Sequence, residues 1–384
     1  HTRYWRDWSS DVCSSDLKAG FFIILGEMPT VKKNIKKKKT KKKSGRTGLL
    51  LIGILAIVFA AFFYTLFLRP ATNFKGEEIV ILIPSNKANK NFVKNKIKLS
   101  IKSAQYSSFL GLAEWFGYWD HIKPGRYVIK KDASIFSFFR KLNSGRQTPI
   151  TLTINKFRTN RDLAKFVSTK FEFTESQFIS FIQNNDSLSS FGVTQQTLMT
   201  LIIPNTYEIY WNVSPKEFIE RMNKESNNFW TSNRIEKAQQ LQLSKEEIYT
   251  IASIVEEETN NNEEKPTIAS VYVNRLNKGM NLGADPTIKF ALNNFSLKRI
   301  TLNHINSSST SPYNTYKKKG LPPGPICTAS ISSIDAVLEG QKTDYLYFCA
   351  KEDFSGSHNF AATDKEHLKN AKKYQRALDS LRIH

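Results

Sequence analysis

The chain has 384 residues, of which 40% are hydrophobic, 12% aromatic and 23% charged. These fractions exclude whole-chain disorder, a collagen-like repeat and a long coiled coil, and the length favours two domains with appendages. The formal net charge is +22, from 56 Lys and Arg residues against 34 Asp and Glu residues. Such an excess predicts a polyanionic partner, whether nucleic acid, an anionic membrane surface or an acidic polymer.

The N-terminal part of the chain is predicted not to belong to the fold. Residues 1–27 show neither helical nor strand periodicity and precede Met28, a candidate initiator, so we interpret them as a non-native leader. Residues 28–46 form a tail with nine Lys, one Arg and no acidic residue. This tail contains too little apolar surface to fold alone.

An uncharged stretch of 22 residues, TGLLLIGILAIVFAAFFYTLFL, follows at residues 47–68. A helix of that length spans roughly 33 Å, enough for a bilayer core, so we expect a transmembrane helix; a buried core helix is the alternative. The lysine-rich tail precedes it, and the positive-inside rule therefore predicts a single-pass protein of the cytoplasmic (inner) membrane with a cytoplasmic N-terminus. The lysines then act mainly as a topology signal beside the headgroups, and nucleic acid is not the expected partner.

Residues 69–150 are predicted to form a small α+β module. The segment EEIVILIP indicates a strand, a basic helical stretch follows, KPGRY is a turn leading into a second strand, and SIFSFFRKLNSG indicates a helix that ends at Gly145. Four aromatic side chains in this module suit either stacking on sugar rings or burial in a core. They are Trp115, Phe116, Tyr118 and Trp119.

The remaining residues, 151–384, are predicted to be mixed α and β. The segment TPITLTINKF indicates a strand, helical patterns follow, and residues 202–211 read as another strand. Ser244 and Glu247 form an S-x-x-E capping box that predicts the start of a long helix. A further amphipathic helix is expected over residues 268–280.

The long helix ends in three consecutive glutamates. At 100° per residue the apolar side chains of IYTIASIVEEET fall in one arc, and Glu258 is the glutamate inside that arc. Glu257 points to the opposite side and Glu256 lies at the margin. A carboxyl group removed from water has a raised pKa, as a general acid needs near neutral pH. A frayed helix end or an ion pair with Arg275 is the alternative.

Downstream residues are candidates to surround Glu258. Asp285 begins a further helix, either as its N-cap or as a second carboxylate of the site. Residues 311–326, SPYNTYKKKGLPPGPI, indicate a rigid loop of the kind that lines a site, although a structural connector is the alternative. Its side chains able to hydrogen-bond N-acetyl and hydroxyl groups are Tyr313, Asn314 and Tyr316.

Metal and disulfide chemistry are not indicated. The six His residues include no HExxH pair, so no metal site is expected. Cys327 and Cys349 lack a CxxC spacing, and small buried residues or a disulfide are both compatible with the sequence.

A series of motifs resembles a known family. IASIVEEET, VYVNRL, ADPT, SPYNTY, GLPPGPI, LYFCA and HNF, in this order after one N-terminal apolar helix, resemble the MltG/YceG-like endolytic murein transglycosylases over residues 69–375. The resemblance implies a LysM-like subdomain at residues 69–150 and a catalytic domain at residues 151–384. In this family the second Glu of the ExE pair is catalytic, which implies Glu258. Helical periodicity selects the same carboxyl group.

The implied activity is cleavage of the β-1,4 bond between N-acetylmuramic acid and N-acetylglucosamine in nascent peptidoglycan. The products would carry 1,6-anhydromuramoyl ends, elongation would stop, and no cofactor would be needed. The implied partners are glycan strands, the inner membrane and peptidoglycan synthases. Two alternatives stay open, namely a hydrolytic muramidase using Glu258 and Asp285, and a non-catalytic cell-wall-binding protein.

Overall fold

The computed structural model describes residues 45–380. The predicted leader and all but the last two residues of the predicted tail lie outside the described residues. The chain divides into two units, residues 1–61 and 62–384. An apolar helix, α1 (Gly45–Phe63), crosses this boundary and continues as a π-helical turn, η1 (Tyr64–Leu68). Within the described residues, Gly48–Leu68 is the one helical stretch long and apolar enough to cross a membrane.

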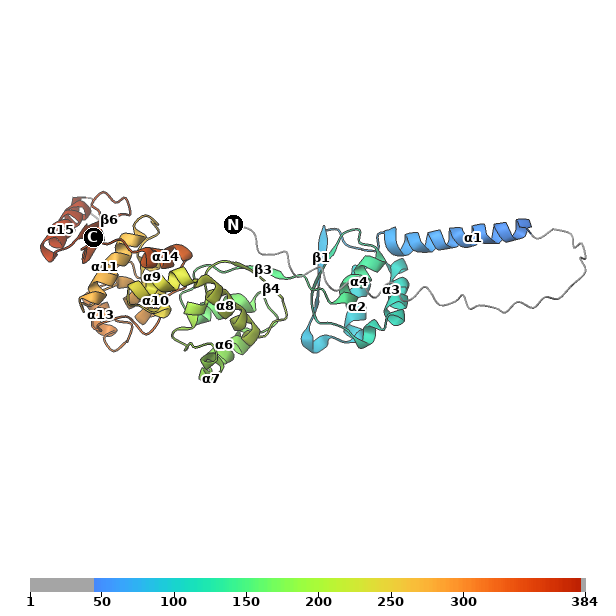
Figure 1. Ribbon diagram of the computed structural model, residues 1–384, viewed down its shortest axis with the longest axis horizontal. Helices are drawn as coiled ribbons and strands as arrows, with labels where there is room; N and C mark the ends of the chain where they lie inside the picture. The colour runs from blue at the N-terminus through green and yellow to red at the C-terminus, as the bar shows by residue number, and fades with distance from the viewer. Residues whose placement is uncertain (1–44, 381–384) are drawn as a thin grey trace, which may run out of the picture. The chain divides into compact units, whose positions relative to one another are not determined.

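The second unit begins with a two-stranded antiparallel sheet and three helices (Figure 1). β1 (Glu78–Ile83) pairs with β2 (Gly125–Lys130), and alternate residues of both strands turn inward to a common core. The predicted order of strand, helix, strand and helix is confirmed, including the left-handed C-cap at Gly145. The helices are α2 (Lys90–Ser100), α3 (Ser103–Trp115) and α4 (Ile135–Ser144).

The predicted basic helical stretch is two helices, because Ile101 has an extended backbone that interrupts it. Ile101 forms an isolated β-bridge with Thr72, which fixes this break against the segment that follows η1. Of the four aromatic residues considered for sugar stacking, Tyr118 is buried in the core. Trp115 and Phe116 are exposed instead.

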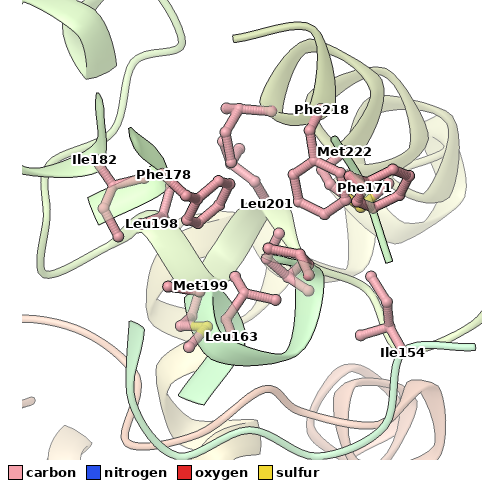
Figure 2. Close-up of a cluster of buried hydrophobic side chains, with 14 of the residues drawn as sticks. Ile154, Leu163, Phe171, Phe178, Ile182, Leu198, Met199, Leu201, Phe218 and Met222 are labelled. Atoms are coloured by element: carbon pink, nitrogen blue, oxygen red, sulfur yellow. The ribbon is translucent and has the colours of Figure 1, made fainter. Parts of the chain in front are cut away.

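A second antiparallel pair opens the next part of the unit. β3 (Ile150–Thr153) pairs with β4 (Thr206–Ile209), so the two strands predicted in this region are confirmed and lie beside each other. Their inward residues join a hydrophobic cluster in which Phe171 packs beside Phe218 and Met222 (Figure 2). The surrounding helices are α5 (Asn160–Ser168), α6 (Glu175–Gln183), α7 (Asn185–Ser189) and α8 (Pro215–Phe229).

A separate hydrophobic cluster surrounds α10 (Lys245–Glu258), against which α11 (Lys265–Asn277) and α14 (Ile331–Glu339) pack. Every residue of α10 from Ile248 to Val255 is buried, so the central part of this helix has no solvent-exposed face. Figure 1 shows α10 among α9, α11 and α14. The remaining elements are α9 (Ser232–Gln240), α12 (Asp285–Ala291), α13 (Leu302–Ser307), β5 (Tyr347–Ala350), β6 (His358–Ala361) and α15 (Asp364–Ser380).

The capping box that predicts the start of α10 is confirmed. The Ser244 side chain accepts a hydrogen bond from the backbone N–H of Glu247, and the Glu247 carboxylate accepts one from the backbone N–H of Ser244. The helix predicted from residue 268 begins earlier, at Lys265. Pro266 lies in its first turn, where a missing N–H breaks no helical hydrogen bond.

Residues 326–328, at the end of the Pro-rich loop, connect the hydrophobic cluster around α10 with the chain that follows β3. The Thr328 N–H donates to the Phe157 carbonyl (2.8 Å), and the Thr328 hydroxyl accepts from the Phe157 N–H (2.9 Å). Two residues earlier, the Ile326 N–H donates to Ser253 Oγ on α10 (3.0 Å). The segment therefore binds α10 on one side and the chain beyond β3 on the other.

Gly324 lies just before this segment, and a side chain there has no room. A Cβ atom at this position would lie 2.2 Å from the carbonyl oxygen of Gln196. We expect Gly324→Ala to lower the free energy of unfolding by about 1–3 kcal/mol, because backbone atoms must move to remove the overlap. Gly111→Ala on α3, where nothing lies within 4 Å, is the matched control. Equal urea midpoints for the two variants would contradict this expectation.

Candidate active site

Glu258, the last residue of α10, lines a cavity of about 820 Å³. The cavity is formed by the end of α10, the α11 helix, the turn before α12, the Pro-rich loop, β5 and the start of α15. Beside Glu258, the lining side chains that bear on its chemistry are Tyr272, Arg275, Asp285, Tyr316, Phe348 and His367. The predicted general acid therefore faces a cavity large enough for a small-molecule or sugar-sized ligand.

Burial raises the pKa of Glu258 to about 7, because the surrounding protein replaces the water that would solvate a carboxylate. The Tyr272 hydroxyl opposes this effect by donating a hydrogen bond of 2.6 Å to Glu258 Oε1. The negative charge of Asp285 acts in the same direction as burial. Near neutral pH the protonated and ionised forms of Glu258 are thus both populated.

The two glutamates beside Glu258 are bound by cations. Glu257 makes ion pairs with Arg158 (2.9 Å) and with Lys156 (3.1 Å), both from the chain between β3 and α5. Glu257 therefore points away from the α10 core, as predicted, but another part of the protein covers it.

Glu256 binds the ammonium group of Lys265 (3.2 Å), which is buried. Burial of Glu256 is outweighed by hydrogen bonds from Ser330 and Ser333 and by the Lys265 charge, so the pKa of Glu256 lies below its ordinary value. Within residues 45–380, the ion pairs include both neighbouring glutamates and leave Glu258 out.

The alternative in which Arg275 neutralises Glu258 is wrong. The Arg275 guanidinium donates instead to two backbone carbonyls, those of Leu346 (2.6 Å) and Leu282 (2.5 Å). It also lies over the ring of Tyr347, 5.4 Å from the ring centroid. Arg275 therefore joins α11 to the segment before β5 and to the turn before α12.

Asp285 is not the N-cap of its helix. Ala284 occupies that position without a side-chain cap, and Asp285 is the first residue of α12. The Asp285 carboxylate instead accepts a hydrogen bond of 2.5 Å from the Tyr316 hydroxyl, inside the cavity that Glu258 lines. The alternative that places a second carboxyl group in the site matches this geometry.

The turn before α12 is fixed by the residue next to Tyr316. The Thr315 carbonyl accepts from the Gly283 N–H (3.0 Å), and the Thr315 hydroxyl accepts from the Ala284 N–H (3.0 Å). Gly283 has φ +58°, a conformation that favours glycine. These bonds hold Asp285 and Tyr316 on the same side of the cavity.

Of the three residues predicted in the Pro-rich loop, Tyr316 faces the cavity of Glu258. Asn314 is fully buried, and its amide donates to Ile305 O and Ser308 Oγ, so the expectation that it contacts a ligand is wrong. Its hydrogen bonds stabilise the loop. Tyr313 packs on Phe290 and lines a different cavity of about 160 Å³.

Sequence reasoning did not assign several residues that line the cavity. Tyr272 lies in the VYVNRL motif and Phe348 in the LYFCA motif, but spacing alone gave no reason to place either beside Glu258. The two rings meet edge to face, 6.0 Å apart. His367 of α15 stacks on Tyr347 at 5.2 Å and completes an aromatic wall.

The cavity thus contains the Glu258 carboxyl group, which makes no ion pair within residues 45–380, and the Asp285 carboxylate, which is hydrogen-bonded to Tyr316. Aromatic side chains form one of its walls. Within residues 45–380 no group of three or more His, Cys, Asp or Glu side chains is arranged to hold a metal ion. Cys327 is buried and Cys349 partly buried, and both are free. A single carboxyl group with a pKa near neutrality can donate a proton and later accept one.

The chain is similar to known proteins over most of its length. The model of the YceG-like family matches residues 84–373. The chain is 30% identical over 297 residues to an endolytic murein transglycosylase of Bacillus subtilis, covering 73% of this chain and 79% of that protein. It is 28% identical to an endolytic murein transglycosylase of Streptococcus pneumoniae, covering 67% of this chain and about half, 51%, of that protein. A crystal structure of a YceG-like protein from Listeria monocytogenes matches with a TM-score of 0.50 and 26% identity, over 76% of this chain and 98% of that one.

Tyr272→Phe removes the hydroxyl that stabilises ionised Glu258 without changing the shape of the aromatic ring. We therefore expect the pKa of Glu258 to rise above about 7, measured by a carboxyl-resolved NMR or infrared titration. Tyr313→Phe, in the separate cavity, is the control and should leave the titration unchanged. A fall of the Glu258 pKa in Tyr272→Phe would show that the hydrogen bond favours the protonated form instead.

Proposed function

The chain belongs to the YceG-like family, and on that premise we propose that it is an endolytic lytic transglycosylase that cleaves peptidoglycan glycan strands. The observation that carries the proposal is the Glu258 carboxyl group, which has a pKa of about 7, makes no ion pair within residues 45–380 and faces a cavity of about 820 Å³. The relatives named endolytic murein transglycosylases support the substrate class.

In the proposed reaction Glu258 acts first as an acid. Its proton passes to the glycosidic oxygen as the bond from C1 of N-acetylmuramic acid to that oxygen breaks. The C6 hydroxyl of the same sugar then attacks C1, and the Glu258 carboxylate accepts the hydroxyl proton. The C1–O6 bond closes the 1,6-anhydro ring, no water is consumed, and Glu258 returns to its protonated state.

The neighbouring side chains have distinct proposed roles in this cycle. The Tyr272 hydroxyl holds Glu258 Oε1, so Oε2 carries the transferable proton. The aromatic wall that includes Tyr347 and Phe348 suits the apolar faces of sugar rings. Asp285 and Tyr316, hydrogen-bonded to each other, would bind sugar hydroxyl groups.

A hydrolytic muramidase is the second candidate, because Asp285 lines the same cavity as Glu258. In that reaction the second carboxylate would activate water or form a sugar adduct, and the product would have a reducing end. The two reactions therefore differ in their products and in their need for Asp285.

We also propose that the apolar helix anchors the chain in the cytoplasmic membrane as a single pass, with the N-terminus in the cytoplasm. The support is the length and composition of Gly48–Leu68 together with the lysine-rich residues that precede it. The cavity of Glu258 would then face the cell wall, where nascent strands emerge from peptidoglycan synthases. A LysM-like role for residues 69–150 belongs to the same proposal.

Glu258→Gln keeps the size of the side chain but has no transferable proton. We expect it to lower the yield of anhydromuramoyl ends by about 10²–10⁴-fold, measured by mass spectrometry of digested glycan strands. Glu246→Gln, on the same helix and outside the cavity, is the matched control and should retain activity. Reducing ends in the wild type, lost in both Glu258→Gln and Asp285→Asn, would favour the muramidase, and no cleavage by any form would favour a binding protein.

The pH dependence of kcat/KM reports the protonation of Glu258 in the free enzyme. Because the acid must be protonated, activity should fall as the pH rises through about 7. In Tyr272→Phe this fall should move to higher pH, since the hydrogen bond that favours the carboxylate is gone. A falling limb near the ordinary glutamate pKa would contradict the assignment of Glu258 as the acid.

A further inference from the structure

The segment that follows the apolar helix holds most of the positive charge of the second unit. Residues 69–150 contain 15 Lys and Arg and five Asp and Glu, a net charge of +10. Residues 151–384 contain 28 Lys and Arg and 25 Asp and Glu, a net charge of +3. The cavity-bearing part of the chain is thus nearly neutral, and the basic character predicts an anionic partner for residues 69–150.

The start of α3 lies next to the end of the apolar helix. Thr72 bridges to Ile101, and the Lys102 ammonium group donates to the Pro70 carbonyl (3.1 Å). Beside this contact Leu99 is 77% exposed, which leaves a large apolar side chain uncovered among lysines. Leu99 therefore lies two residues before Ile101, which pairs with the segment that follows η1.

Aromatic contacts link η1, α4 and the end of α3. Phe67 of η1 packs on Phe136 of α4, with ring centroids 4.5 Å apart. Phe139, one turn further along α4, contacts Phe116 at 5.4 Å. Phe116 is 53% exposed and the adjacent Trp115 is 87% exposed. Two large aromatic side chains thus remain uncovered at the end of α3, and one of them, Phe116, contacts the α4 helix that also contacts η1.

We propose that Trp115 and Phe116, with the Lys and Arg residues of residues 69–150, form a membrane-proximal surface that docks on anionic phospholipid headgroups. The proposal rests on the membrane anchoring proposed above. Aromatic side chains favour the boundary between headgroups and acyl chains, and Lys and Arg bind anionic headgroups. Attachment through the anchor keeps the effective concentration of the surface at the bilayer high.

A glycan strand is the competing occupant, since exposed aromatic rings also bind sugars. Two observations favour lipid. Tyr118 is buried and Trp119 is covered by Lys90 and Lys94, so Trp115 and Phe116 are the uncovered rings of the four. Phe116 contacts α4, which also packs on η1. Residues 69–150 also carry a net charge of +10, which binds anionic headgroups but is not needed to stack on the uncharged faces of sugar rings.

The test is hydrogen exchange of the full chain in nanodiscs of phosphatidylcholine, with and without phosphatidylglycerol. We expect the peptides that cover residues 99–117 to exchange more slowly with the anionic lipid, and high salt to reverse the effect. Equal exchange in both lipids would overturn the docking. Slower exchange caused by added glycan strands, and not by the anionic lipid, would overturn it in favour of sugar binding.

Two pairs of substitutions separate lipid docking from a general effect of charge. Lys98→Gln with Arg140→Gln should weaken the protection by roughly fivefold for each charge removed at low salt. Lys165→Gln with Lys224→Gln removes the same charge outside residues 69–150 and should leave it unchanged. An equal loss in both pairs would overturn the assignment to this surface.

Two further measurements distinguish failure of the docking from failure of the proposals on which it rests. A chain that does not float with vesicles would overturn both the anchoring and the docking. A chain that floats and produces anhydromuramoyl ends, yet shows no lipid-dependent exchange, would overturn only the docking.

Discussion

The arrangement around the cavity depends on the burial of the central part of α10, Ile248 to Val255. A helix buried in this way cannot end in three glutamates unless each carboxyl group has a partner or stays protonated, because an isolated charge away from water is costly. Glu256 and Glu257 have cations, whereas Glu258 has a tyrosine hydroxyl and a raised pKa. Packing of the helix core thus fixes which of the three carboxyl groups can exchange a proton near neutral pH.

Much of the secondary structure follows from local sequence. The capping box of α10, the turn at Gly145 and the alternation in β1 and β2 are short-range patterns, and each is present in the structure. Local periodicity also selects Glu258, although it treats the helix as having one buried face and one solvent-exposed face. The helix has no solvent face along most of its length, and Glu257, on the side opposite its apolar arc, is bound by Arg158, 99 residues earlier in the sequence.

The features that the sequence left open or misplaced depend on contacts between distant segments. Asp285 reads locally as an N-cap, and only its contact with Tyr316 turns the carboxylate into the cavity. Asn314 reads as a ligand-binding amide, but contacts within its own loop use its hydrogen-bonding groups. Tyr272 lies on a helix whose rotation relative to α10 is set by packing, which no spacing along the chain reveals.

The ion pairs of Glu257 have a consequence for dissecting this protein. Lys156 and Arg158 belong to the chain between β3 and α5, while the helix they neutralise belongs to a different hydrophobic cluster. A fragment that begins after α8 would keep α10 but leave Glu257 as an uncompensated charge one residue from Glu258. It would also lose the backbone partners of Thr328. The smallest catalytic fragment must therefore start before Lys156, even though every residue proposed to touch the sugar lies beyond residue 257.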